Sequence, residues 1–429
     1  MNNPETTTNE EVFVFINHTE TSGLKKREPA LFFTPSMRLF ASPTTFLRER
    51  YTQSGRSPSP NTWANIAYAL AGWFNFLFEI DVDDWRRASR DDLIAYRDVY
   101  SQAVSPKTGH PYATGTIAGR MAAILGFYKF AGQRCWYDGD ILGEPESRQP
   151  TGGVGLATPA SADTRNVHCM RTLADLMPRR RPSRSAVRPF FDAELRAFLS
   201  ALGPRASERG NGDARPCRDR LIGDIGVFVG LRNDEIHQLT KYQFLTMHPD
   251  AEAPLADQRL TITGKGQVAR TVAIPNWLAL DVLAYIDGER AQAARAGRQT
   301  GRKEAPDLFL AGVESNAPGR PLTHRRFQQV VEEACLRAGI IRIVSRIDPE
   351  TGAVTEVKKA KHCVHDLRHT YAVLTYWAEK MGGNAEPWKK IQAQLGHRHL
   401  NTTINTYLCY VDIFGKRERL IDVHKLIGL

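Results

Sequence analysis

The chain has 429 residues, of which 42% are hydrophobic and 24% charged, and its formal net charge at pH 7 is +10. This balance is typical of a soluble intracellular protein with two or three domains, and we expect neither a signal peptide nor a membrane span. The six scattered cysteines include no C-x-x-C pair, which argues against a disulfide framework or a zinc ribbon, whereas the positive charge favours nucleic acid as a partner.

The first third of the chain divides into a polar arm and a helical region. Residues 1–40 show little periodicity and are expected to form an N-terminal arm. In residues 41–143, apolar side chains recur in steps of three and four, which predicts amphipathic helices that begin near Pro60, Ser89 and Thr114. We therefore expect a small helical bundle.

A basic linker is predicted to follow the bundle. Residues 144–187 combine a glycine-rich run with a tract of arginines and show no helical period. A linker of this kind can cross a DNA backbone and bind phosphates; the alternative is a solvated run of charge. The arginines proposed to contact DNA are Arg179, Arg180, Arg181 and Arg184.

Residues 188–429 are expected to form a second, mainly helical domain. Within it, Arg259 to Ile274 alternates in two halves that are separated by Gly264-Lys265-Gly266, which predicts a β-hairpin. The predicted fold class is therefore mainly α with a small β-sheet in the second domain, an α+β arrangement.

The first chemically suggestive cluster runs from Gly230 to Leu239. Its apolar spacing predicts the start of a helix with Arg232 near the beginning. A cation there is unfavourable next to the helix dipole unless an anion binds to it. The alternative is a surface ion pair between Arg232 and Glu235, three positions apart.

The second cluster is His365-Asp366-Leu367-Arg368-His369. His365 and Arg368 are three apart and share a helix face, where an imidazole and a guanidinium suit the oxygens of a phosphate. His365 and His369 also have the spacing of a zinc-binding helix. An Arg between the two histidines disfavours that metal site.

The third cluster joins a turn to a helix. Gly396 is expected to end one helix and to place His397 on the turn, and Tyr407 follows ten residues later. Tyr407 could equally be a core aromatic, and Tyr410 is a competing phenol. Together with Lys265 at the hairpin tip, the three clusters provide guanidiniums, imidazoles, an amine and a phenol, the groups that phosphoryl transfer through a covalent intermediate needs.

This set resembles the tyrosine recombinase, or phage integrase, family of site-specific DNA recombinases over residues 188–412. The family's motifs occur here in the family's order: G-L-R at Gly230–Arg232, a hairpin lysine at Lys265, H-x-L-R-H at His365–His369, L-G-H at Leu395–His397 and a tyrosine after Thr402-Thr403 at Tyr407. The helical region resembles the family's core-binding (SAM-like) domain by position and pattern. The family's commoner interval from His397 to the tyrosine is nine residues, and Thr406 looks like the extra one.

The resemblance implies a two-domain clamp around double-stranded DNA and a 3′-phosphotyrosyl intermediate. Tyr407 would be the nucleophile and Lys265 the proton donor to the leaving 5′ oxygen. Arg232 and Arg368 would hold the non-bridging oxygens. The remaining roles are an acid/base for His365, a hydrogen bond to the phosphate for His397, and support of Arg232 for Glu235.

The resemblance further implies a homo-tetramer on two paired sites, formed from monomers or dimers, with accessory DNA-bending proteins as partners and no metal, ATP or other cofactor. The apolar tail from Val411 to Leu429 would dock on a neighbouring subunit or on its own. The expected location is the bacterial cytoplasm or nucleoid. A type IB topoisomerase, a DNA-binding regulator and a zinc hydrolase remain as alternative functions.

Overall fold

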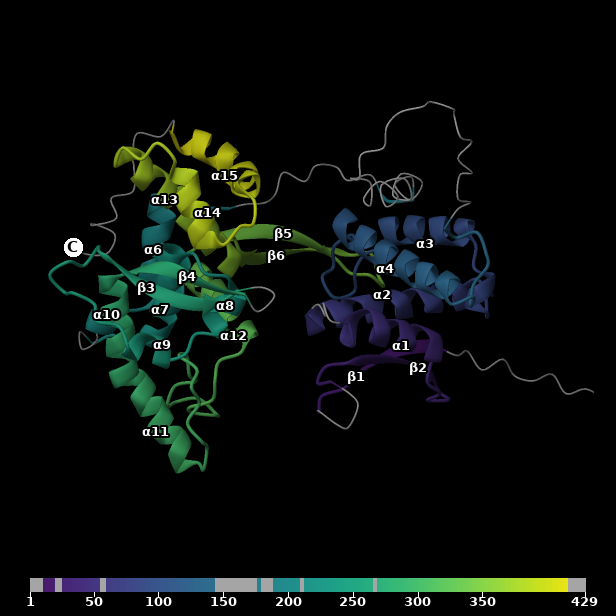
Figure 1. Ribbon diagram of the computed structural model, residues 1–429, viewed down its shortest axis with the longest axis horizontal. Coiled ribbons are helices and arrows are strands. Elements are labelled where there is room, and N and C mark those ends of the chain that lie inside the picture. The colour runs from purple at the N-terminus through teal and green to yellow at the C-terminus, as the bar shows by residue number, and fades with distance from the viewer. Residues whose placement is uncertain are drawn as a thin grey trace, which may run out of the picture. The chain divides into compact units, whose positions relative to one another are not determined.

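The computed structural model describes residues 11–19, 25–54, 59–142, 176–178, 188–208, 212–264 and 268–415, without the side chains of 408–410 and 412–415. The predicted linker arginines, Lys265, the side chain of Tyr410 and the tail beyond 415 lie outside these residues. The chain divides into two compact units, Met1–Ser183 with Ser345–Thr355, and Arg184–Val344 with Glu356–Leu429. Both are mainly helical with small two-stranded sheets (Figure 1), so the predicted fold class is confirmed.

The first unit consists of helices and one β-hairpin. Its elements are β1 (Glu11–Ile16), β2 (Pro29–Thr34), α1 (Ala41–Leu47), η1 (Arg48–Thr52), α2 (Pro60–Glu79), η2 (Trp85–Arg87), α3 (Arg90–Gln102) and α4 (Thr114–Gln133). The three predicted helix starts are confirmed. At α3 the Ser89 hydroxyl accepts a hydrogen bond from the Asp92 amide, and the Asp92 carboxylate accepts one from the Ser89 amide, which satisfies two free backbone donors of the first turn.

The core of this unit is rich in aromatic side chains. The buried Trp73 on α2 donates a hydrogen bond through Nε1 to the Tyr128 hydroxyl on α4 at 3.1 Å. That hydroxyl in turn donates to the backbone oxygen of Trp85 at 2.9 Å. The polar groups of both buried rings therefore have hydrogen-bond partners, as buried Trp and Tyr side chains usually do.

Two strands occur in the range expected to form an N-terminal arm. β1 and β2 pair in antiparallel fashion, and Val12, Leu31 and Phe33 are buried. On α2, the amide of Asn75 exchanges two hydrogen bonds with the backbone of Val12, at 2.6 and 3.0 Å. This part of the arm range thus contributes to the core, because its alternating apolar side chains have a helix to pack against.

The second unit carries the remaining elements, except that residues 345–355, at the end of β5 and the start of β6, belong to the first unit. They are α6 (Asp192–Leu202), η3 (Ala206–Glu208), α7 (Cys217–Asp224), η4 (Ile225–Val229), α8 (Asn233–His237), α9 (Tyr242–Leu245), β3 (Asp257–Thr263), β4 (Ala269–Pro275), α10 (Asn276–Tyr285), η5 (Ile286–Arg290), α11 (Ala291–Gln299), α12 (His324–Arg337), β5 (Ile341–Ile347), β6 (Val354–Ala360), α13 (Val364–Met381), α14 (Pro387–Leu395) and α15 (Leu400–Gly415). β3 and β4 pair antiparallel, which confirms the hairpin predicted around residue 265.

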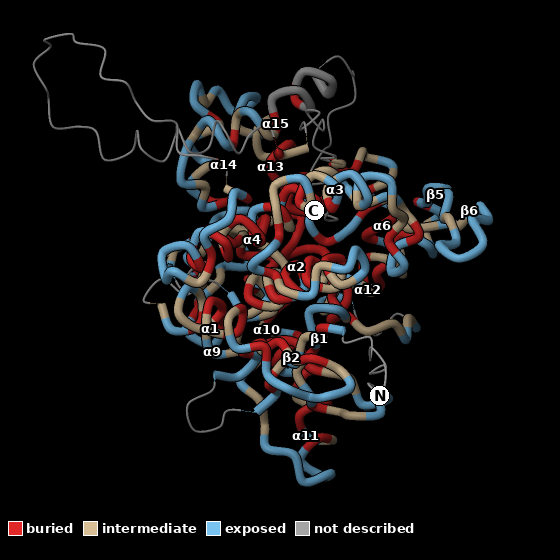
Figure 2. The backbone as a smooth tube through the Cα atoms, turned by 90° about the vertical axis from the view of Figure 1, so that its right-hand side faces the viewer, coloured by how far each residue is buried: buried red, intermediate tan, exposed pale blue. Residues whose placement is uncertain are grey.

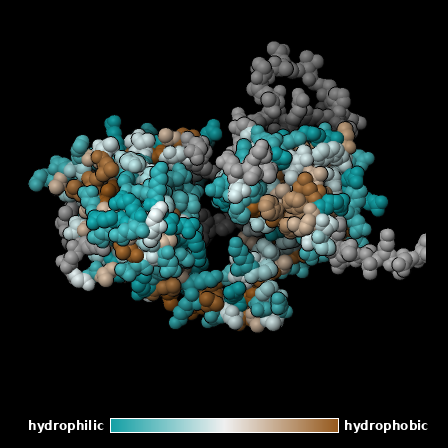
Figure 3. Space-filling view, turned by 90° about the horizontal axis from the view of Figure 1, so that it is seen from below, coloured by the Kyte–Doolittle hydropathy of each residue, from teal (hydrophilic) through white to brown (hydrophobic). Residues whose placement is uncertain are grey.

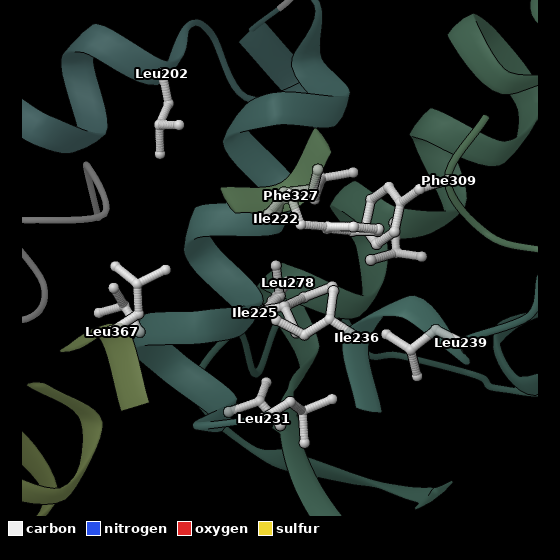
Figure 4. Close-up of a cluster of buried hydrophobic side chains, with 14 of the residues drawn as sticks. Leu202, Ile222, Ile225, Leu231, Ile236, Leu239, Leu278, Phe309, Phe327 and Leu367 are labelled. Atoms are coloured by element: carbon white, nitrogen blue, oxygen red, sulfur yellow. The ribbon is translucent and has the colours of Figure 1, made fainter. Parts of the chain in front are cut away.

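The largest apolar core of this unit packs most of its helices against the β3–β4 hairpin (Figure 4), and a smaller cluster lies between α13, α14 and α15. Leu231 and Ile236, on either side of Arg232, are fully buried. On α13, Leu367 packs so closely on η4 that a Cβ at Gly226 would lie 2.6 Å from its Cδ1. The residue after Leu367 is Arg368, so this packing places its guanidinium beside the start of α8.

The hairpin of β5 and β6 was not predicted. Its strands are mostly exposed (Figure 2), so they lack the buried alternate face that marks a strand in a sequence. Exposed apolar side chains occur here and on β1, among them Ile343, Val354 and Phe15.

Figure 3 shows a face of the molecule on which hydrophobic residues form separate patches in a mostly hydrophilic surface. None of the helices in the described ranges is long and apolar enough to cross a membrane.

Candidate active site

Arg232 is the residue that precedes helix α8, as the sequence predicted. Gly230, two residues earlier, ends η4 in the left-handed conformation at φ +73°, and a Cβ there would lie 2.6 Å from the Tyr371 ring. Glycine is therefore required for the sharp turn that presents Arg232. The Arg232 side chain is 31% exposed and donates to Glu235 at 2.8 Å, so the predicted ion pair forms at the edge of the site.

Glu235 is a buried carboxylate surrounded by arginines. It accepts hydrogen bonds from the Arg232 amide at 2.9 Å and from Arg270 at 2.7 and 3.0 Å, and Arg368 lies 3.8 Å away. Burial alone would raise its pKa, but the hydrogen bonds from Arg270 and Arg232 outweigh burial and lower the pKa. Glu235 is thus an anion that organises three cations.

Arg368 is held from two sides by backbone carbonyls. It lies on α13, is 1% exposed, and donates through Nη1 to the Gly230 oxygen at 2.8 Å and through Nη2 to the Leu395 oxygen at 2.5 Å. Burial and the nearby Arg232 lower its pKa to about 10, so the guanidinium remains charged at pH 7. His365, one turn earlier on the same helix, is exposed.

His397 lies on the turn between α14 and α15, as predicted. Gly396 ends α14 in the left-handed conformation at φ +64°. The His397 ring is bracketed by two hydrogen-bonding groups: Nδ1 is 2.8 Å from the Thr403 hydroxyl and Nε2 is 3.4 Å from Nη2 of Arg368. Burial and the positive charges of Arg368 and Arg232 lower its pKa to about 4, so the ring is neutral at pH 7.

Tyr407 lies on α15 with its ring 1% exposed. Its hydroxyl is 3.3 Å from Nδ1 of His369, and its ring is parallel to that of His397 at 6.4 Å between centroids. Burial raises the pKa of Tyr407, whereas burial and His365 lower that of His369 to about 3. A neutral phenol therefore faces a neutral imidazole. α15 is regular through Thr406, so the extra residue causes no irregularity in the helix.

The structure thus brings together five of the six predicted catalytic residues, and the sixth, Lys265, lies outside the described residues. The five come from separate segments: the start of α8, helix α13, the turn after α14, and helix α15. Glu235 lies among them. In the described part of the chain no three His, Cys, Asp or Glu side chains are placed to hold a metal ion.

Three contributors to this site were missed or underrated. Arg270 was not singled out, although it alternates with the buried Val272 and Ile274 on β4, and a charged residue on the inward face of a strand is a usable signal. Thr403 was quoted only as part of a motif. His369 was considered as part of its motif and for its spacing from His365 but was given no catalytic role, and the structure places it against the Tyr407 hydroxyl.

Acidification is expected to destabilise the second unit. His369 and His397 have folded pKa values of about 3 and about 4, below the ordinary value of about 6.5. At pH values between these folded pKa values and 6.5, the unfolded chain binds more protons than the folded protein does. The free energy of unfolding therefore rises with pH in this range and is lost as the pH falls from 6.5 towards 4. Thermal denaturation at pH 7.0, 5.5 and 4.5 measures this loss. The His369→Gln variant should lose less over the interval, and an equal loss would contradict the assignment.

Comparison with known proteins gives relatives over most of the chain. It is 23% identical over 354 residues to the tyrosine recombinase XerC of Herpetosiphon aurantiacus, covering 82% of this chain and 86% of the relative. It is 28% identical over 210 residues to the tyrosine recombinase XerH of Campylobacter jejuni, covering 49% and 45% of the two chains. No model of a known protein family matches the chain.

Among solved structures, the chain shares its fold with the XerH site-specific recombinase bound to a palindromic difH substrate in a post-cleavage complex. The TM-score is 0.53 at 16% identity, and the match covers 87% of this chain and 93% of the other. At this identity the likeness concerns the fold.

Proposed function

Because this chain belongs to the tyrosine recombinase family, we propose that it cleaves and rejoins DNA at specific sites through a covalent bond to Tyr407. The observation that supports this most is the meeting of Arg232, Arg368 and His397 around the Tyr407 phenol, from segments far apart in the sequence. An aromatic side chain that only fills a core does not need guanidiniums and an imidazole around it, whereas a phenol that attacks a phosphate does.

In the proposed reaction, Oη of Tyr407 forms a bond to the scissile phosphorus while the bond from phosphorus to the 5′ oxygen breaks. The products are a 3′-phosphotyrosyl ester and a free 5′-hydroxyl strand, and Lys265 gives the leaving oxygen its proton. The 5′-hydroxyl of a partner strand then attacks the ester and releases Tyr407. The phosphotyrosyl ester conserves the energy of the phosphodiester bond that was broken, so the proposed reaction needs neither ATP nor a metal ion.

Arg232 and Arg368 hold the non-bridging oxygens and stabilise the charge that develops on the phosphorane. Arg368 is suited to this because its carbonyl anchors fix the plane of the guanidinium before DNA binds. A preorganised cation loses little conformational freedom when the transition state forms. Arg232 is more exposed, and its contact with Glu235 orients its guanidinium at the edge of the site.

The three imidazoles of the site transfer protons or orient the phenol and the phosphate. His369 is neutral at pH 7, so its Nδ1 can accept the Tyr407 hydrogen bond and hold the phenol until it attacks. His365 faces out from α13 and serves as acid/base. His397 donates a hydrogen bond to the phosphate. The Tyr407 side chain, 1% exposed here, must be uncovered before it meets DNA.

Thr403 is expected to set the proton position on His397. Without DNA, Nη2 of Arg368 can only donate to Nε2, so the neutral ring carries its proton on Nδ1 and donates it to the Thr403 hydroxyl. Once the Arg368 guanidinium binds the phosphate instead, Thr403 can donate to Nδ1, which leaves the ring proton on Nε2 for the phosphate. Thr403→Val keeps the shape and removes the hydroxyl, so we expect cleavage to slow about tenfold or more, with Thr403→Ser close to wild type. Single-turnover cleavage of bound DNA measures both, and equal rates for Val and Ser would refute the role.

We propose double-stranded DNA as the partner, bound largely through phosphates, to which the arginines of residues 179–184 contribute. Assembly is proposed to reach a homo-tetramer on two paired sites, with the tail beyond Val411 docking in cis or in trans. Accessory DNA-bending proteins would assist pairing, and the protein would act in the cytoplasm.

A covalent trapping experiment tests the proposal. Duplexes with a randomised centre are first enriched by binding to the protein, and the recovered consensus is rebuilt with a nick just 3′ of each candidate scissile phosphate. Cleavage then releases a short strand, so religation fails and a protein–DNA adduct should accumulate on a denaturing gel. The same amount of adduct is expected in the presence of EDTA.

Supercoiled plasmids distinguish recombination from the topoisomerase alternative. Plasmids with two copies of the recovered site should yield recombinants, and plasmids without the site should stay supercoiled. Relaxation by a monomer without recombinants would favour a type IB topoisomerase. Binding without any adduct would favour a DNA-binding regulator and refute the proposed function.

A further inference from the structure

Arg270, on the inward face of β4, contacts several parts of the site although it is not among the predicted catalytic residues. Its Nη1 and Nη2 donate to the two oxygens of Glu235 at 2.7 and 3.0 Å. Glu235 in turn accepts from Arg232 at 2.8 Å. Arg270 is therefore one ionic contact away from Arg232, although β4 and α8 are far apart in the sequence.

The same guanidinium lies against two glycines. A Cβ at Gly396 would be 2.8 Å from both Cδ and Nε of Arg270, and a Cβ at Gly264 would be 2.9 Å from its Nη1. Gly396 directly precedes His397, and Gly264 directly precedes Lys265. Each glycine thus leaves room for Arg270 at the residue before a proposed catalytic side chain.

The Arg270 side chain is largely enclosed by protein. The Arg270 side chain is only 16% exposed, and its Nε is buried without a hydrogen-bond partner among the described residues. In an arginine that formed an ion pair on the surface, the Nε–H group would donate a hydrogen bond to water. The bidentate bond to Glu235 and the packing on Gly396 therefore hold Arg270 where it is, at a cost in solvation.

We propose that Arg270 is a positioning residue that aligns Arg232 and the His397 turn for phosphoryl transfer without touching the DNA phosphate. This inference rests on the proposed function. Arg270 neutralises Glu235, so that this carboxylate orients Arg232 without binding it too tightly for it to reach a phosphate. Its alkyl chain and guanidinium meanwhile support the backbone at Gly396, which determines where the His397 ring lies.

The loss of Arg270 has a definite physical consequence. Glu235 would keep its charge and its burial, with only Arg232 and the more distant Arg368 to compensate it. The Arg232 guanidinium would be drawn towards the carboxylate and away from the phosphate, and the gap beside Gly396 would free the His397 turn. A displacement of about 1 Å in a catalytic group costs about a hundredfold in rate.

The test compares variants by single-turnover cleavage of the nicked duplex at saturating protein, with DNA affinity measured separately. Arg270→Gln is expected to slow adduct formation about tenfold to a hundredfold, with affinity unchanged within about threefold. Arg270→Lys, which keeps the charge but not the fork, should be intermediate. Arg259→Gln is the matched control, because Arg259 lies exposed on β3 of the same hairpin and should cleave at the wild-type rate.

A double variant shows whether Arg270 acts through Glu235. Arg270→Gln and Glu235→Gln should not be additive, since each breaks the same ion pair, so the double variant should be about as slow as the slower single variant. Should Arg270→Gln fail to fold, as thermal denaturation would show, Arg270→Lys decides, and its full activity would overturn the proposal. Equal rates for Arg270→Gln and Arg259→Gln would also overturn it. Failure of the wild-type protein to form an adduct would instead count against the proposed function.

Discussion

Replacing Tyr407 by phenylalanine is expected to abolish the covalent protein–DNA adduct completely, because the substitution removes the hydroxyl oxygen that forms the proposed ester. The phenylalanine ring still fills the small core between α13, α14 and α15, and the lost hydrogen bond to His369 costs about 1 kcal/mol of stability. The variant should therefore fold and bind the duplex as the wild type does. A denaturing gel measures the adduct, and a mobility shift on the same duplex measures binding.

Tyr371→Phe is the matched control for this prediction. Tyr371 belongs to the same buried cluster, and burial raises its pKa to about 12, but it lies on α13 and has no proposed part in the chemistry. This variant should form the adduct at nearly the wild-type rate. An adduct that persists in Tyr407→Phe would show that another residue is the nucleophile, and Tyr410 would be the next to replace.

Replacing Arg368 by lysine is expected to slow cleavage by about 10²- to 10³-fold, the effect of removing one preorganised donor from a developing oxyanion. A lysine keeps the charge, but a single ammonium cannot bond the Gly230 and Leu395 oxygens and a phosphate oxygen in the fixed plane of a guanidinium. DNA binding should change little, since many phosphate contacts contribute to affinity. Single-turnover cleavage and binding titrations separate the two quantities.

The control is Arg196→Gln on α6, where Arg196 forms an exposed ion pair with Asp192. Such a pair contributes little to stability, and its loss should leave both cleavage and binding unchanged. Because Arg368 is buried, its variant also needs a thermal denaturation curve to show that the protein is folded. Weaker DNA binding of Arg368→Lys, with unaltered cleavage per bound complex, would contradict a role in the transition state.

The parts of the site that could be predicted from the sequence are those carried by one short segment. Arg232 with Glu235, His365 with Arg368, and Gly396 with His397 each lie within a single helix start, helix turn or cap. Helical spacing and the need for glycine at a left-handed cap are local rules. The β3–β4 hairpin was predictable for the same reason, because alternation and a glycine-rich turn are visible in consecutive residues.

The pairing of segments far apart in the chain could be decided only by the tertiary structure. No local pattern shows that Arg368 bonds the oxygens of Gly230 and Leu395, or that Arg270 supports Glu235 and the turn before His397. Nor does the sequence show that the Tyr407 hydroxyl meets His369 inside a core. The physical reason is that periodicity reports which face of an element is buried, whereas the partner on that face depends on how the whole chain packs.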